Sequence, residues 1–170
     1  MQHGRLPHGY DHKYVYSHIG YNLKVTDMQA AIGMAQLEKL PSFIEKRKEN
    51  FKRIAELLAP YKKYLILPKA TKNSEPSWFG FPITVKENES FTRNKLTKYL
   101  EDNKIMTRLL FAGNVTKQPA YLDTECRIVG DLGNTDYIMN NTFFIGVYPG
   151  IGDTQIEYIN DTFKNFFEGL

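Results

Sequence analysis

A helix that is apolar almost all the way round constrains this chain more than any other feature of its sequence. Thr26 and Gln29 stand three residues apart in the order of a capping box, which satisfies free backbone donors at a helix start. From Met28 to Leu37 the only polar side chains are Gln29 and Gln36, which lie seven residues apart and therefore on one stripe. Such a helix is buried on most sides, either in an ordinary core or between two domains or subunits.

The loop before this helix favours a position between two domains or subunits. Between Ser17 and Lys24 the loop carries a hydroxyl, an imidazole, an amide and an ammonium group, and Gly20 is free to adopt backbone angles that other residues avoid. Together these groups suit an anionic ligand.

Length and composition limit the class of protein. A chain of 170 residues fits one domain, and its apolar share of 42% is typical of a soluble globular protein. No apolar run approaches the roughly 20 residues of a membrane span, so we expect a cytoplasmic protein without a membrane partner. Cys126, the single cysteine, cannot form an internal disulfide. The net charge of +3 is spread along the chain, which gives no case for nucleic acid but leaves anionic small molecules possible.

The distribution of periodic runs along the sequence predicts an extended N-terminal segment followed by one folded domain. Residues 1–25 hold all four histidines and no clear periodicity, which indicates an extended segment that lies on other protein. Residues 26–170 show the periodic runs of a folded domain.

Periodicity and capping signals place the elements of this domain. Helices are expected over 27–37, from Ser42 to Pro60, over 92–103, over 134–140 and from Thr154 onward, and strands over 64–67, 78–85, 105–110 and 142–147. Two further capping boxes, Ser42 to Glu45 and Thr154 to Glu157, mark the starts of the second and last helices. The order predicts an α+β fold, or α/β layers, in which helices cover one side of a small sheet.

Several motifs resemble those of one enzyme family. Residues 20–37 read GYNLKVTDMQAAIGMAQL, and PSWFGFP, TRLLFAGN and QPAY follow at 76–82, 107–114 and 118–121. The first motif resembles the DegT, DnrJ, EryC1 and StrS superfamily of sugar aminotransferases, and the later three resemble its 3-dehydrase branch, which acts on CDP-4-keto-6-deoxyglucose. The resemblance extends from about Leu6 to Phe167.

The resemblance implies a fold and an activity. The chain corresponds to the small C-terminal domain of a fold-type I transferase that depends on pyridoxal or pyridoxamine phosphate (PLP or PMP), and its first 25 residues would pack on a preceding large domain. The parent enzyme would be a homodimer that removes the C3 hydroxyl of a nucleotide-linked 4-keto-6-deoxyhexose on the route to the dideoxyhexoses of lipopolysaccharide. A reductase would be its partner, and the isolated chain would be inactive.

The resemblance also implies roles for single residues. Asn22 would reach the cofactor phosphate of the neighbouring subunit, where its amide can donate without changing the net charge. Arg108 would face the nucleotide-sugar, because a guanidinium grips phosphate with two parallel hydrogen bonds. The remaining expected substrate contacts are Lys24, Phe111, Asn114 and Gln118.

Neither a catalytic residue nor a metal ligand is expected in the chain. The histidine that acts as catalytic base in the dehydrase branch and the cysteines of its iron–sulfur cluster both lie upstream in the resembling proteins. His8 and His12 are four residues apart, but Pro7 and Gly9 oppose the helix that would bring them together.

Three alternatives remain open from the sequence. A sugar aminotransferase of the same superfamily would have a lysine in place of the upstream histidine, and a cluster-free 3-dehydrase would lack the upstream cysteines. A stand-alone binding or dimerisation module would use the apolar helix to pair with itself or with a partner.

Overall fold

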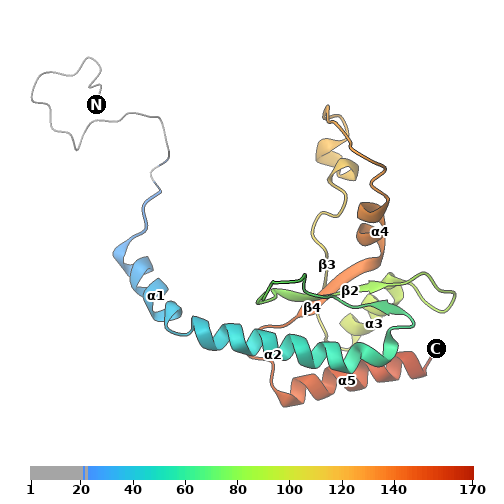
Figure 1. Cartoon of the computed structure of the whole chain (residues 1–170), viewed down its shortest axis with the longest axis horizontal. Coiled ribbons are helices and arrows are strands. Elements are labelled where there is room, and N and C mark those ends of the chain that lie inside the picture. The colour runs from blue at the N-terminus through green and yellow to red at the C-terminus, as the bar shows by residue number, and fades with distance from the viewer. Residues whose placement is uncertain (1–20, 22) are drawn as a thin grey trace, which may run out of the picture. The chain divides into compact units, whose positions relative to one another are not determined.

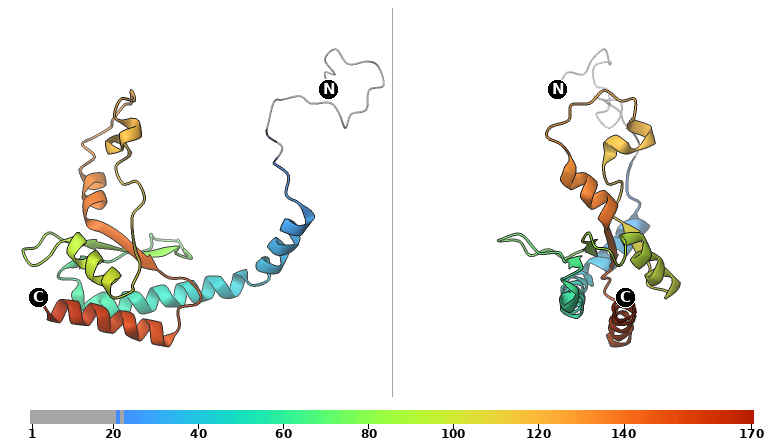
Figure 2. Two further views of the ribbon diagram at one scale, coloured as in Figure 1. Left: turned by 180° about the vertical axis from the view of Figure 1, so that it is seen from behind. Right: turned by 90° about the vertical axis from the view of Figure 1, so that its right-hand side faces the viewer.

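The computed structural model describes residues 21 and 23–170 of the chain, and the chain divides into two units, Met1–Glu38 and Lys39–Leu170. The described part of the first unit contains helix α1 (Asp27–Leu37). The second unit contains a four-stranded sheet and its helices (Figures 1 and 2). The expected boundary between residues 25 and 26 is not tested by this division.

Helix α1 has the predicted start. The Thr26 hydroxyl accepts from the backbone N–H of Gln29 at 3.3 Å, and the Gln29 side chain accepts from the backbone N–H of Thr26 at 3.0 Å, which together form the capping box. No residue of α1 is buried, and Ile32 and Met34 are 65% and 72% exposed.

In the second unit all neighbouring strands are antiparallel, in the order β1-β2-β4-β3. The strands are β1 (Leu65–Ile66), β2 (Gly80–Val85), β3 (Thr107–Leu109) and β4 (Thr142–Gly146). The central pair β2–β4 has the longest register, which runs from Gly80 opposite Gly146 to Thr84 opposite Thr142.

Three helices cover one face of the sheet (Figures 1 and 2). They are α2 (Leu40–Leu58), α3 (Arg93–Asp102) and α5 (Asp153–Glu168), whose buried residues join one core with the alternate strand residues Phe81, Ile83, Val85, Phe143 and Ile145. The α+β prediction, with helices over a small sheet, is therefore confirmed.

Pro82, Thr84, Thr142, Phe144 and Arg108 alternate with the core residues and lie on the opposite face of the sheet. We call it the open face, because α4 (Gly133–Asn141) and the segment that precedes it rise from this side without covering it completely (Figure 2). Helix α4 is followed by β4 without an intervening loop.

Two of the predicted capping boxes are wrong. Helix α2 begins at Leu40, with Pro41 in its first turn, and the Ser42 hydroxyl donates to the backbone oxygen of Lys39 at 2.8 Å and caps nothing. Helix α5 begins at Asp153, where the Gln155 side chain accepts from the backbone N–H of Gly152 at 3.0 Å. In both cases the helix starts earlier than the box, since a helix can use a proline at its first turn or a glycine cap.

The remaining predicted elements exist, with shorter strands than expected. The second unit also contains the 3₁₀ turns η2 (Ala59–Tyr61), η3 (Val115–Lys117) and η4 (Pro119–Tyr121). Among residues 21 and 23–170, no helix is both long and apolar enough to cross a bilayer.

The glycine pair of the central strands supplies a test of this packing. A Cβ on Gly80 would collide with the edge of the Phe144 ring, whereas a Cβ on Gly146, directly opposite, would meet nothing within 4 Å. Gly80→Ala is expected to lower the free energy of unfolding by about 1–3 kcal/mol, because overpacking displaces the ring.

Urea denaturation followed by circular dichroism measures the change, and Gly146→Ala is the matched control. Equal midpoints for the two variants would contradict the assigned position of the Phe144 ring.

Candidate functional site

Arg108 lies on the open face in a row with two residues of the central strands. In the register of the sheet Arg108 stands opposite Phe144, and Phe144 stands opposite Pro82. Arg108 is exposed, and Phe144 beside it is only 8% exposed. An exposed guanidinium therefore lies next to an apolar floor.

Two further aromatic rings border this floor. The ring centroid of Phe144 lies 5.9 Å from that of Phe79 and 6.0 Å from that of Phe111. Phe111 is 77% exposed and has a φ of 51°, a left-handed conformation that is strained for a bulky side chain. Phe144 thus joins residues from β3, from β4 and from the loops before β2 and after β3.

A cavity of about 740 Å³ opens beside Arg108. Apolar and aromatic side chains form most of its wall, among them Phe79, Phe144, Tyr148 and Tyr158. Its charged lining residues are Arg47, Lys104 and Arg108, and no carboxylate of the described chain lines it. A cavity with three cations and aromatic walls is suited to an anion that carries a flat ring or a sugar.

Hydrogen bonds fix the Arg47 side chain and the backbone next to Arg108. Arg47 belongs to α2 and donates from Nη1 to the backbone oxygen of Trp78 at 3.5 Å. Before Arg108, the carboxylate of Glu101 accepts from the backbone N–H and the hydroxyl of Thr107, which fixes the start of β3. These hydrogen bonds, and to a smaller extent the charge of Arg108, hold the pKa of Glu101 below its usual range.

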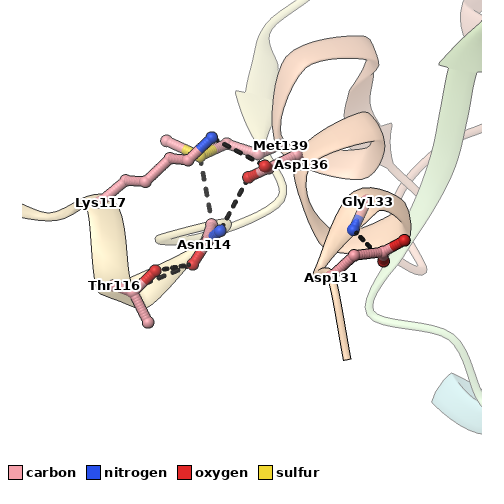
Figure 3. A network of polar contacts seen from close by, with 7 residues as sticks. All are labelled: Asn114, Thr116, Lys117, Asp131, Gly133, Asp136 and Met139. Atoms are coloured by element: carbon pink, nitrogen blue, oxygen red, sulfur yellow. Dashed lines mark hydrogen bonds and ion pairs between the residues drawn. The ribbon is translucent and has the colours of Figure 1, made fainter. Parts of the chain in front are cut away.

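A second group of polar contacts, the Asp136 network, connects the segment after β3 to α4 (Figure 3). It consists of Asn114, Thr116, Lys117 and Asp136. One carboxylate oxygen of Asp136 accepts from Asn114 Nδ2 and the other from Lys117 Nζ, each at 2.7 Å. Asn114 Oδ1 accepts from the backbone N–H of Thr116 at 3.1 Å and from its hydroxyl at 2.7 Å. The Lys117 ammonium, and after it the Asn114 amide, lowers the pKa of Asp136.

The network also depends on Gly113. This glycine has a φ of 62°, and a Cβ there would collide with the side chain of Met139, whose sulfur accepts from the backbone N–H of Asn114 at 3.3 Å (Figure 3). The chain can therefore approach α4 closely only with glycine at this position.

Four of the six expected site residues lie on the segment that runs from β3 to η4. Arg108 and Phe111 border the open face, whereas Asn114 is 3% exposed and uses both ends of its amide inside the chain. Gln118 donates from Nε2 to the backbone oxygen of Ala112 at 2.7 Å. Their proposed contacts with a sugar stay predictions, and Asn114 has in addition an internal structural task.

The other two expected residues belong to the first unit. Lys24 is exposed, and Asn22 lies outside the described residues. No group of three or more histidine, cysteine or carboxylate residues that could hold a metal occurs in the part of the chain described by the structure, and the four histidines also lie outside that part.

Sequence reasoning missed Arg47, Phe144 and Asp136. The alternation of β4 could have placed Phe144 on the face opposite the core, but its neighbours come from distant parts of the sequence. Arg47 stands among other charges on α2, and Asp136 is a lone charge among polar and apolar residues on α4, so neither carries a local signal for a site.

The described residues fit the phosphate of a ligand better than the ring of a pyridoxal cofactor. A pyridinium nitrogen needs an acidic partner, and the lining of the cavity offers only cations, hydroxyls and amides. The described lining therefore supplies no partner for the ring nitrogen of such a cofactor.

The chain is similar in sequence to proteins of one known enzyme family. Residues 1–164 match the model of the DegT/DnrJ/EryC1/StrS aminotransferase family. Over 167 residues the chain is 54% identical to the lipopolysaccharide biosynthesis protein RfbH of Salmonella typhimurium, covering 98% of this chain and 38% of the relative. Over 163 residues it is 48% identical to the dTDP-4-dehydro-2,6-dideoxy-D-glucose 3-dehydratase of Saccharopolyspora spinosa, covering 96% and 35%.

A solved structure shares the fold. The Escherichia coli GDP-4-keto-6-deoxy-D-mannose-3-dehydratase with bound hydrated PLP superposes with a TM-score of 0.79 at 28% identity, covering 88% of this chain and 38% of that chain. The chain thus spans little more than a third of the length of the relatives it matches.

Alanine variants of Phe144 and Phe111 test which of the two rings stabilises the fold and which is available to a ligand. Phe144→Ala is expected to lower the free energy of unfolding by about 3–5 kcal/mol, because the ring is buried among Phe79, Phe111 and Gly80. Phe111→Ala is expected to change it by less than about 0.5 kcal/mol, since that ring is mostly exposed. Thermal denaturation tests both variants, and a large loss for Phe111→Ala would mean that this ring serves the fold.

Proposed function

The chain belongs to the DegT/DnrJ/EryC1/StrS aminotransferase family, and we propose that it forms the substrate-binding C-terminal part of a nucleotide-sugar 3-dehydratase that depends on PLP or PMP. The substrate class is a nucleoside diphosphate linked to a 4-keto-6-deoxyhexose, and the reaction removes its C3 hydroxyl. The products would serve the synthesis of dideoxyhexoses for lipopolysaccharide.

The cavity beside Arg108 is the observation that carries this proposal. A nucleotide-sugar combines a charged diphosphate with a flat base and a hexose, and the cavity combines three cations with aromatic walls. The similarity to the named 3-dehydratase of S. spinosa, at 48% identity, supports the same ligand class and favours a dehydratase over an aminotransferase.

In this proposal the residues of the chain bind and orient the substrate. Arg108 and Arg47 would grip the diphosphate, because a guanidinium matches two phosphate oxygens at once. The ring of Phe79 in the cavity wall, and that of Phe111 next to Phe144 on the open face, would pack on the base or the hexose and exclude water from the sugar. The acid–base step belongs to residues that are not in this chain, so the isolated chain would be inactive.

Two further contacts belong to the same proposal. Asn22 would donate to the cofactor phosphate of the neighbouring subunit in a homodimer, and Lys24 would lie near the substrate. A reductase would deliver the electrons that complete deoxygenation.

A chimeric enzyme tests the proposal. The 163 matched residues of the S. spinosa dehydratase are replaced by the matching residues of this chain. The chimera is expected to retain 3-dehydration of its nucleotide-sugar, and Arg108→Met within it is expected to lower kcat/KM about 10- to 100-fold through the lost charged hydrogen bonds. Product formation is followed by mass spectrometry.

Arg53→Met is the matched control. Arg53 lies on the same helix as Arg47 but pairs with Asp153 at 2.7 Å and does not line the cavity. Its loss should leave kcat/KM within about twofold. Full activity of the Arg108→Met chimera would remove the central argument for the substrate site.

The exposed surface of α1 supports a protein partner. We propose that Met28, Ile32, Met34 and Leu37, all at least 65% exposed, are covered by protein in the assembled enzyme. In the isolated chain this surface would drive self-association.

Size-exclusion chromatography with light scattering tests this prediction. The mass of the wild-type chain is expected to rise above 19.7 kDa with concentration. Ile32→Glu should shift the chain towards the monomer, and Gln36→Glu, on the polar stripe, should not. A wild-type monomer at high concentration would count against the prediction.

A further inference from the structure

Asp136 is the point at which the segment from Phe111 to Gln118 joins α4. Its two oxygens take one hydrogen bond each from Asn114 and Lys117, so a single carboxylate fixes two residues of the segment (Figure 3). Asp136 lies in the first turn of α4, where the helix dipole also favours a negative charge.

Asn114 passes this constraint to the backbone. It is 3% exposed, and its Oδ1 is occupied by the N–H and the hydroxyl of Thr116 while its Nδ2 binds Asp136. With both ends of its amide engaged, the side chain has one orientation. The backbone from Gly113 to Thr116 is therefore fixed relative to α4.

The fixed backbone determines where Phe111 lies. Phe111 and Gly113 both have left-handed φ angles, of 51° and 62°, and a phenylalanine holds this conformation only when its surroundings impose it. The Phe111 ring lies 6.0 Å from Phe144, the strand partner of Arg108. Loss of the restraint would free the ring from this neighbour.

We propose that Asp136 is a positioning residue, which acts through Asn114 and Lys117 to hold Phe111 beside Phe144, the strand partner of Arg108, on the open face. The inference rests on the proposed function, because this position matters only if a ligand meets Arg108. Neither oxygen of Asp136 needs to touch that ligand.

The charge of Asp136 makes the inference testable by pH. Lys117, from η3, is the charged group of the described residues that faces the carboxylate, and the Asn114 amide is its other partner. Both lower the pKa of Asp136 from its ordinary value of 3.8. The network is therefore intact above pH 3.8 and is lost as the pH falls through the lower folded-state pKa.

Nuclear magnetic resonance of the complete 170-residue chain, without ligand, provides the readout. In the wild type the Asn114 side-chain amide signals and the Phe111–Phe144 ring contact are expected to change together in one step below pH 3.8. The methyl signals of Ile83 and Ile145 report whether the sheet remains folded.

Three variants separate a charged positioning role from simple packing. Asp136→Ala should abolish the ring contact at pH 7 and speed exchange of the Thr116 amide at least about tenfold. Asp136→Asn removes the charge that binds Lys117, as protonation does, so it should weaken the ring contact at pH 7 and abolish the pH step. Asp123→Asn, at an exposed aspartate of the same connecting segment, should behave as the wild type.

Lys117→Met keeps the test decisive if Asp136→Ala fails to fold. Removing the ammonium should move the pH step of Asp136 upward, towards 3.8. An unchanged ring contact in folded Asp136→Ala, a pH step that persists in Asp136→Asn, or a step that does not move in Lys117→Met would each overturn the inference.

These results are independent of the ligand. If the chimera is inactive while the pH step follows Asp136, the proposed function fails and the geometric role stands. If the chimera is active and no step follows Asp136, the positioning role fails and the proposed function stands.

Discussion

The single apolar core between the sheet and three helices is the constraint on which the rest of the molecule depends. Phe81, Ile83, Phe143 and Ile145 point into this core, and strand alternation then sends their neighbours to the other face. The open face with Phe144 and Arg108 is thus a by-product of core formation. A surface available for binding arises here because the helices complete the core on one side.

The sequence allowed every helix and strand of the second unit to be located approximately, because the longer helices carry a periodic signal and the shorter elements lie between recognisable breaks. The capping boxes at Ser42 and Thr154 misplaced two helix starts, since Pro41 and Gly152 provide competing local solutions. The strand order β1-β2-β4-β3 could not be predicted from local sequence signals. It depends on contacts between residues far apart in the chain, which periodicity does not encode.

In the candidate site, too, some residues could be found from local sequence signals and others could not. Arg108 and Phe111 were found from a motif, whereas Arg47 joins them only because α2 packs under the sheet near the same cavity. Asn114 illustrates the limit of motif reasoning, because its buried amide is engaged by Thr116 and Asp136. A residue that a motif marks for a ligand can instead shape the loop that presents its neighbours.

The direct passage of α4 into β4 connects the Asp136 network to the central strand of the sheet. With no loop between Asn141 and Thr142, the helix and the central strand share one continuous backbone. Eight positions of uninterrupted helix and strand therefore separate the Asp136 carboxylate from the Phe144 ring, so the anchor of the connecting segment and the apolar floor of the open face are built on one rigid stretch of chain.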